Sequence, residues 1–315
     1  MGFEALLGNE RLKETLSAGL RKGHISHFYL ISGPKGSGKH TLAKLLAQAI
    51  LCEGSGKPCG VCGPCRKLDS GNHPDFITVE DPEHKNVAVK IVRQTREDVF
   101  IRPNESAYKI YLFPQELGVE GQNALLKILE EPPPYGVFLL LSDNPEKLLT
   151  TVRSRCTELK LQARPEKLLH RQLRMDFPQA SEEDLASAME RSGGFLGQAR
   201  EILAEGGALP PQTEAFVRCF AARDYLGLTQ LLAPLEKSKR DPLLELLNGW
   251  RGLLEQAFAC RTGGAGAGSL ARQLAQSRSS AELLAAIKVL SKAAEYCQGN
   301  VSPGAVCGWL AWSLR

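Results

Sequence analysis

Two groups of residues in the first part of the chain have types and spacings that could do chemistry. One is a glycine-rich turn that reads Gly33-Pro34-Lys35-Gly36-Ser37-Gly38-Lys39-His40-Thr41. The other is a set of four cysteines within fourteen positions, namely Cys52, Cys59, Cys62 and Cys65. Glycine-rich turns can cradle phosphate groups with backbone N–H groups, and clustered thiolates can bind metal ions. The first group therefore predicts a phosphate site and the second a metal site.

The glycine-rich turn has the setting that a phosphate-binding loop requires. An apolar run at residues 28–32 precedes it and a helix-like segment at residues 42–47 follows it, which gives the order strand, loop and helix. The glycines would turn N–H groups inward, and Lys39 would reach the terminal phosphates. The candidate nucleotide-binding residues are Gly33, Gly36, Gly38, Lys39 and Thr41.

The first departure from a working loop is His40. The residue after Lys39 should be Ser or Thr, because its hydroxyl holds Mg²⁺. A neutral imidazole is a poor ligand for this hard, oxygen-seeking cation. We therefore expect nucleotide binding at this loop to be weak or absent, and Mg²⁺ binding to be lost.

The acidic pair of a P-loop ATPase is also missing. It should follow a strand beside the loop, and the natural host is residues 109–113, yet Pro114 and Gln115 come next. A register counted back from Asn123 places apolar residues there instead. Glu116 is close, but a lone carboxylate after a proline is more often a solvated loop residue. Without metal-holding residues, we predict no meaningful hydrolysis.

The four cysteines have the spacing of a structural metal site. The last three follow a C-x2-C-x2-C pattern, and four thiolates can close a tetrahedral shell around one Zn²⁺. A closed shell leaves no open position for catalysis. The alternatives are four unliganded thiols or an iron–sulfur cluster, and the spacing favours zinc over both.

The rest of the chain predicts an α/β part followed by an all-helical part. Strands are expected at residues 28–32, 75–79, 109–113, 137–141 and 157–161, and helices at residues 10–19, 42–51, 89–100 and 122–131. Strands separated by helices imply a five-stranded parallel sheet covered on both sides. After Arg164 only helices are expected, including 198–204 and 241–260. Their start signals are Pro165, Ser181 with Asp184, Ser279 with Glu282, and Ser302-Pro303.

The composition of the chain and its glycine-rich stretches predict its number of domains and its cellular location. At 315 residues, two or three domains are expected, and glycine-rich linkers are predicted at 206–211 and 263–268. No signal peptide and no membrane span are predicted, and nine cysteines fit a reducing, cytoplasmic location. The formal charge of +4 allows nucleic-acid contact without requiring it. The cysteines of the helical part lie far apart and are read as buried apolar residues.

Two further segments carry a likeness to a known family. The segments that carry it are residues 123–133, which read NALLKILEEPP, and residues 151–156, which read TVRSRC. With the cysteine insertion after the P-loop helix, the chain resembles the AAA+ subunits of bacterial replicative clamp loaders. The likeness covers residues 1–203, and the helical remainder agrees only in size and type. Some subunits of this family are ATP-driven motors, whereas others have degraded nucleotide motifs.

The resemblance implies three domains and a set of partners. These are an AAA+ core at 1–162 with the zinc module at 52–65, a helical lid at 163–207 and a helical collar at 208–315. The lid of a motor subunit would carry a nucleotide-sensing arginine where this chain has Gly197. The implied partners are motor subunits, the delta subunit, the sliding clamp and primed template DNA, within a DNA polymerase III holoenzyme.

The resemblance also gives Arg155 a role. It would act as an arginine finger in a neighbouring subunit's ATP site, with Ser154 and Cys156 positioning the loop. From the residues alone, an ion pair within its own loop is the more favoured reading. The expected function is a non-hydrolysing structural subunit that supplies this finger. One alternative is an active motor that uses His40 or Thr41, together with Glu116, as atypical ligands. The other is a zinc-bearing DNA-binding module, although the basic residues of the chain are scattered.

Overall fold

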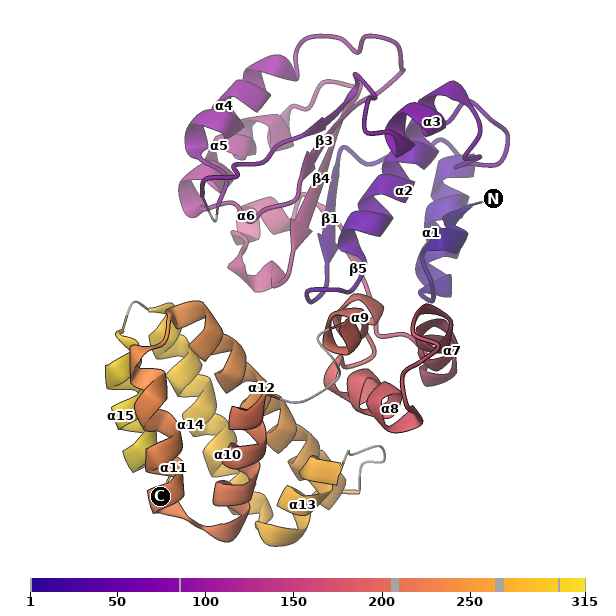
Figure 1. Cartoon of the computed structure of the whole chain (residues 1–315). Coiled ribbons are helices and arrows are strands. Elements are labelled where there is room, and N and C mark those ends of the chain that lie inside the picture. Colours follow the sequence, from indigo (N-terminus) through magenta and orange to yellow (C-terminus); the bar gives the residue numbers. More distant parts are fainter. Residues whose placement is uncertain (1, 85, 205–209, 264–268, 300, 315) are drawn as a thin grey trace. The chain divides into compact units, whose positions relative to one another are not determined.

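The computed structural model describes residues 2–84, 86–204, 210–263, 269–299 and 301–314, and its contacts divide the chain into two compact units. We call Met1–Asp176 with Gly193–Glu201 the N-terminal unit, and Phe177–Ser192 with Ile202–Arg315 the C-terminal unit. Figure 1 shows the elements of each. The predicted linkers, 206–211 and 263–268, lie largely outside the described residues. In the described part of the chain, no helix is long and apolar enough to cross a membrane.

A five-stranded parallel sheet forms the centre of the N-terminal unit. Its strands are β1 Phe28–Ser32, β2 Phe76–Thr78, β3 Lys109–Phe113, β4 Gly136–Ser142 and β5 Thr157–Lys160. Their order is β2-β3-β4-β1-β5, and every pairing is parallel. All residues of β1, β3 and β4 are buried, as strands covered on both faces should be. The predicted sheet, its strand number and its direction are confirmed.

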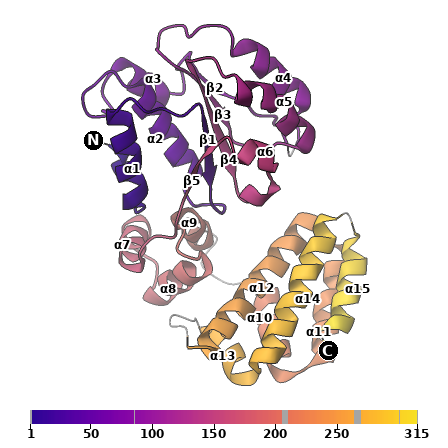
Figure 2. The ribbon, with the colours of Figure 1, turned by 180° about the vertical axis from the view of Figure 1, so that it is seen from behind.

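Helices cover both faces of this sheet (Figures 1 and 2). They are α1 Glu10–Arg21, α2 Lys39–Leu51 and α3 Gly63–Asp69 on one side, and α4 Val89–Asp98, α5 Val119–Glu130 and α6 Thr150–Arg153 on the other. The N-terminal unit also contains α7 Glu166–Asp176 and the first residues of α9 Leu196–Ala204. The pleat of β1 sends Tyr29 and Ile31 into one apolar cluster with α1 and α2. Phe28 and Leu30 enter the other cluster, with α4 and α5. The two faces thus form two separate cores.

Helix α5 begins three residues before the predicted start at Gln122. Val119 in its first turn is exposed, so this turn does not continue the buried apolar stripe from which the helix was predicted. The amide of Gln122 is buried and bridges two segments: Nε2 donates to the carbonyl of Leu117 (2.8 Å), and Oε1 accepts from the N–H of Leu149 (2.7 Å). The short helix α3 was not predicted either, and it holds Cys65 of the cysteine cluster.

In its described residues, the C-terminal unit contains helices and no strand, as predicted. Its helices are α8 Glu182–Arg191, α10 Pro211–Ala222, α11 Tyr225–Leu232, α12 Arg240–Arg261, α13 Ser269–Ser277, α14 Ser280–Gln298 and α15 Pro303–Ser313. The two predicted capping boxes, at α8 and α14, are confirmed. The predicted lid, 163–207, contributes helices to both units, and its existence as a third domain stays a prediction.

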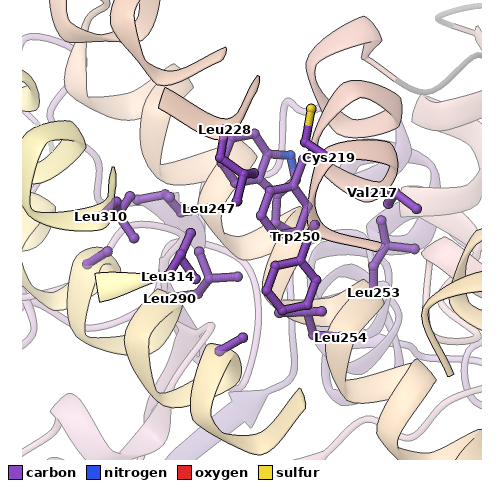
Figure 3. Close-up of a cluster of buried hydrophobic side chains, with 14 of the residues drawn as sticks. Val217, Cys219, Leu228, Leu247, Trp250, Leu253, Leu254, Leu290, Leu310 and Leu314 are labelled. Carbon is purple, nitrogen blue, oxygen red and sulfur yellow. The ribbon is translucent and has the colours of Figure 1, made fainter. Parts of the chain in front are cut away.

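Trp250 lies at the centre of the helical core (Figure 3). Its ring is fully buried and stacks on Phe216 with centroids 4.4 Å apart. Its indole N–H donates to Thr213 Oγ1 at 3.2 Å, so the one polar atom of the ring is satisfied. Cysteines 219, 297 and 307 are buried in this cluster and Cys260 packs at its border, which agrees with their reading as apolar residues.

Candidate functional site

The glycine-rich turn joins β1 to α2 in the predicted way. Gly36 and Gly38 have φ values of +73° and +102°, a left-handed backbone that favours glycine. Gly38 is the N-cap residue of α2, which begins at Lys39. The first N–H groups of this helix have no acceptor within the helix, and its dipole is positive at this end. The turn is therefore built to face an anion.

Lys39, however, is already fully engaged by its own unit. Its side chain is only 9% exposed, and its ammonium lies 2.6 Å from Asp143 Oδ1, directly after β4. It also donates to the carbonyls of Gly33 (2.7 Å) and Pro34 (2.9 Å). These three acceptors use all three donors of the ammonium group. A nucleotide phosphate would have to displace Asp143 before it could use this lysine.

His40 and Thr41 line a cavity of about 470 Å³ beside the loop. Loss of solvation, and then the neighbouring Lys39 ammonium, lower the pKa of His40 below its usual value. The imidazole is therefore neutral at pH 7, a form that binds transition metals in preference to Mg²⁺.

The residues after β3 stabilise a turn instead of a metal ion. The side chain of Gln115 accepts from the N–H of Asp81 at 2.7 Å and donates to the carbonyls of Asp81 (3.0 Å) and His84 (3.1 Å). Glu116 pairs with Lys147 at 3.0 Å. Both side chains are thus engaged in links to neighbouring segments.

Gly197 closes the loop from the side of α9. Its N–H donates to the carbonyl of Gly36 at 2.9 Å. A Cβ built on Gly197 would lie 2.6 Å from the Cα of Gly36, and one built on Gly36 would overlap the backbone nitrogen of Gln198. No arginine side chain fits at this position in this arrangement. The chain also places Arg200 at the cavity, where it pairs with Asp176 at 2.7 Å.

We expect Gly197→Ala to destabilise the N-terminal unit by about 1–3 kcal/mol, because the added methyl meets backbone that cannot rotate away. Urea unfolding followed by far-UV circular dichroism would measure this. The matched control is Gly19→Ala in α1, where a Cβ makes ordinary contact and alanine favours the helix. Equal stability of the Gly197→Ala variant and the wild type would show that the close contact is not maintained in solution.

Arg155 lies in the loop between α6 and β5, with its side chain 39% exposed. Its Nη1 donates to the carbonyl of Thr151 at 2.9 Å, and its Nη2 lies 3.3 Å from Glu130 Oε1. Ser154 Oγ donates to the same carbonyl at 3.3 Å. Burial raises the pKa of Cys156 to about 12, so this thiol does not react as a thiolate. The loop holds an accessible guanidinium in a defined place.

The four cysteines form one cluster that fits a tetrahedral metal. Their sulfur atoms all lie within 4.8 Å of one another. Cys59 and Cys65 are 4.0 Å apart and Cys52 and Cys62 3.9 Å apart, close to the ~3.8 Å edge that four Zn–S bonds of about 2.3 Å produce. Backbone N–H groups of Val61 and Cys62 lower the pKa of Cys59 to about 6, which favours the thiolate.

The cluster is joined to the P-loop helix. Cys52 follows α2 directly, and Cys65 lies on α3. The buried Gln48 of α2 donates to the carbonyl of Cys65 (3.4 Å) and to Asp69 (2.9 Å). A metal held here would fix the carboxyl end of α2.

We expect the purified chain to carry about one zinc ion, and Cys65→Ser to bind zinc at least about tenfold more weakly, because three thiolates cannot close the shell. Elemental analysis and competition with a chromogenic chelator would measure both. Cys297→Ser, which removes a buried thiol outside the cluster, should keep the full zinc content. Equal zinc content in the two variants would contradict a four-cysteine site.

Sequence reasoning missed two residues at the loop. Asp143 had a usable signal, because the carboxyl ends of parallel strands meet at one edge of a sheet and Asp143 is the first acidic residue after β4. Arg164, which also lines the cavity, had none, since it precedes a proline in a connection between β5 and α7.

Comparisons with known proteins give the family. The model described as "DNA polymerase III, delta subunit" matches residues 8–165, half of the chain. The DNA polymerase III subunit tau of Bacillus subtilis is 37% identical over 158 residues, which are 49% of this chain and 28% of that protein. The Escherichia coli subunit tau is 38% identical over 165 residues, 51% of this chain and 25% of that protein. The chain thus spans about a quarter of the length of these relatives.

Among solved structures, a gamma subunit-related protein of Thermotoga maritima covers 96% of this chain and 98% of its own, at 19% identity and a TM-score of 0.40. The Bacillus subtilis clamp loader delta protein covers 96% and 98%, at 12% identity and a TM-score of 0.34. On the match over half of its length, the chain belongs to the DNA polymerase III, delta subunit family.

Proposed function

We propose that this chain is a non-hydrolysing structural subunit of a bacterial replicative clamp loader, of the delta-prime type. It presents Arg155 to the ATP site of a neighbouring motor subunit while the sliding clamp is placed on primed DNA. The main support for the absence of hydrolysis comes from the contacts of Lys39. The lysine that should hold phosphate is bound to Asp143 and to two carbonyls of its own loop.

Three further features support the absence of hydrolysis. His40 replaces the hydroxyl that would bind Mg²⁺, Gln115 and Glu116 are engaged in structural links, and Gly197 leaves no room for a sensing arginine. In phosphoryl transfer, bound Mg²⁺ and cationic side chains neutralise the charge that develops on the phosphate. Losing them together removes most of the stabilisation on which the reaction depends.

Two features support the finger role of Arg155: its side chain is exposed, and neighbouring residues hold its guanidinium. A finger acting in another subunit must be accessible, and its guanidinium must be held near the productive orientation. Thr151 and Glu130 provide such a hold from two different helices. The contact with Glu130 is an exposed ion pair, which costs little to exchange for a phosphate of the neighbour.

The remaining parts have supporting roles in this proposal. Zinc bound by the four cysteines is structural and keeps α2 and α3 together. The helical segment 208–315, which lies within the C-terminal unit, forms the collar through which other clamp-loader subunits, including the delta subunit, are held. The assembly places the chain among the components of a DNA polymerase III holoenzyme, in the cytoplasm.

The direct test is ATP turnover by the isolated chain with Mg²⁺. We expect turnover indistinguishable from that of a buffer blank, because the Mg²⁺-binding residues are absent. A coupled assay for released phosphate would measure it, with a motor subunit as positive control. Turnover at about 1 s⁻¹ or more, within the usual enzyme range, would instead favour a motor that uses atypical ligands.

A further inference from the structure

Gln122 is a buried amide near the start of α5. It is 2% exposed, and burying an amide is unfavourable unless its polar atoms find partners. Its Nε2 donates to the carbonyls of Leu117 (2.8 Å) and Lys147 (3.3 Å), and its Oε1 accepts from the N–H of Leu149 (2.7 Å). Exchanging Nε2 and Oε1 would set donor against donor, so these contacts fix the orientation of the amide. Two of the three hydrogen bonds reach the segment directly before α6.

Helix α6 has little of its own to hold its start. It has only four residues, too few for a helix that is stable by itself. Its N-cap residue is Leu149, and no side-chain cap bond is present. Among the described residues, the N–H of Leu149 bonds to no acceptor other than Gln122 Oε1. Gln122 therefore fixes the start of α6, while the buried Val152 packs its middle into the apolar cluster of α5.

Arg155 follows α6 so closely that its position depends on this helix. Its N–H donates to the carbonyl of Val152 at 3.1 Å, and its Nη1 donates to the carbonyl of Thr151 at 2.9 Å. Glu130, in the last turn of α5, lies 3.3 Å from Nη2 of the same guanidinium. Helix α5 thus supports this region at two places, with Gln122 at the start of α6 and Glu130 at the guanidinium.

We infer that Gln122 is a positioning residue for Arg155, because through the start of α6 it sets where the guanidinium stands. The inference rests on the proposed function, since positioning matters only if Arg155 acts on a neighbour's phosphate. Such a group must be held within about 0.5 Å of its productive geometry, and a displacement of about 1 Å can cost about 100-fold in rate. The exposed contact with Glu130 is given up when the guanidinium meets a phosphate, whereas the buried bonds of Gln122 remain.

Steady-state ATP turnover of a reconstituted clamp-loader complex tests this with Gln122→Met, whose side chain is also unbranched but makes none of the three hydrogen bonds. We expect kcat to fall about 10- to 100-fold with KM for ATP unchanged, because positioning acts on the transition state and not on bound ATP. The matched control is Thr95→Val, which removes another buried polar group, a hydroxyl that donates within α4 to the carbonyl of Ile91 at 3.0 Å. It should turn over as the wild type does, and equal losses in the two variants would overturn the inference.

A double variant separates positioning from a merely structural role. Gln122→Met added to Arg155→Ala should cause no further loss of turnover, because a positioning residue acts only through the group that it positions. A further loss as large as that of Gln122→Met alone overturns the inference. Unchanged turnover of Gln122→Met, where Arg155→Ala is impaired, also overturns it and leaves the finger role standing. If Arg155→Ala itself turns over as the wild type does, the proposed function fails and this inference fails with it.

Hydrogen exchange of the wild-type chain, followed by NMR, decides the matter if Gln122→Met does not fold. Amides at the start of a helix ordinarily lack an acceptor and exchange fast. Relative to its intrinsic rate, the N–H of Leu149 should exchange at least about tenfold more slowly than the N–H of Thr151, because Gln122 binds the first and the second lies in the same turn without a printed bond of this kind. Equal protection of the two amides would overturn the inference.

Discussion

Replacing Arg155 with alanine should lower the ATP turnover of a reconstituted clamp-loader complex by about three orders of magnitude or more, the range measured for fingers supplied in trans. The physical reason is electrostatic. The guanidinium would stand where negative charge develops on the transferred phosphoryl group, in a site from which water is largely excluded. Steady-state phosphate release in the presence of clamp and primed DNA measures the effect.

The loss should not come from unfolding. Arg155 is 39% exposed, and its ion pair with Glu130 is of the exposed kind that contributes about 0–1 kcal/mol to stability. The unfolding midpoint of Arg155→Ala should therefore stay close to that of the wild type. The matched control is Arg153→Ala, two positions away, whose guanidinium is paired with Glu146 at 2.6 Å and Glu158 at 3.6 Å. If both variants reduce turnover equally, or neither does, Arg155 is not the finger.

Trp250→Ala should destabilise the C-terminal unit by about 3–5 kcal/mol, the usual cost of truncating a fully buried large aromatic residue. The substitution removes the stacking on Phe216 and leaves a cavity that neighbouring helices cannot fill completely. It also takes the indole donor away from Thr213 Oγ1, which is itself buried. Urea unfolding followed by circular dichroism at helical wavelengths would measure the change in midpoint.

The control for this variant is Trp312→Ala. Trp312 is 73% exposed, so the same truncation should change stability by less than about 0.5 kcal/mol. Both variants retain two of the three tryptophans, which keeps fluorescence available as a second probe. A loss below about 1.5 kcal/mol for Trp250→Ala would mean that the helical core is looser than its packing indicates.

The sheet could be predicted because its strands have a strong local signal. Residues 109–113 and 137–141 are nearly all apolar over a strand's length, and the helix between them has a clear apolar stripe. Boundaries were less predictable where a turn of helix is solvated, as at Val119. The cysteine cluster could be predicted from spacing alone, because the short segment 52–65 keeps its four thiols within reach of one metal ion.

The contacts that the P-loop residues make could not be predicted from the sequence in the same way. Residue types predicted which groups were missing, as with His40 and Gln115. The partners of the loop residues that are present come from segments far apart in sequence: Lys39 pairs with Asp143, and Gly36 accepts a hydrogen bond from Gly197. Each pair needs the folded sheet to place it: the loop pattern identifies Lys39 and Gly36, but no local pattern predicts which residue each of them contacts. The burial of Arg164 is of the same kind, because it depends on the folded chain.

The ion pair of Lys39 with Asp143 also sets the affinity of any ligand that competes for this lysine. Such a ligand binds only the fraction of molecules in which the ammonium is released, so its apparent dissociation constant is the intrinsic one divided by that fraction. If release occurs in about 1% of molecules, binding weakens about 100-fold without a single contact to the ligand being lost. Asp143 thus acts as a tethered competitor, held beside the ammonium group at an effective concentration that does not depend on the carboxylates in solution.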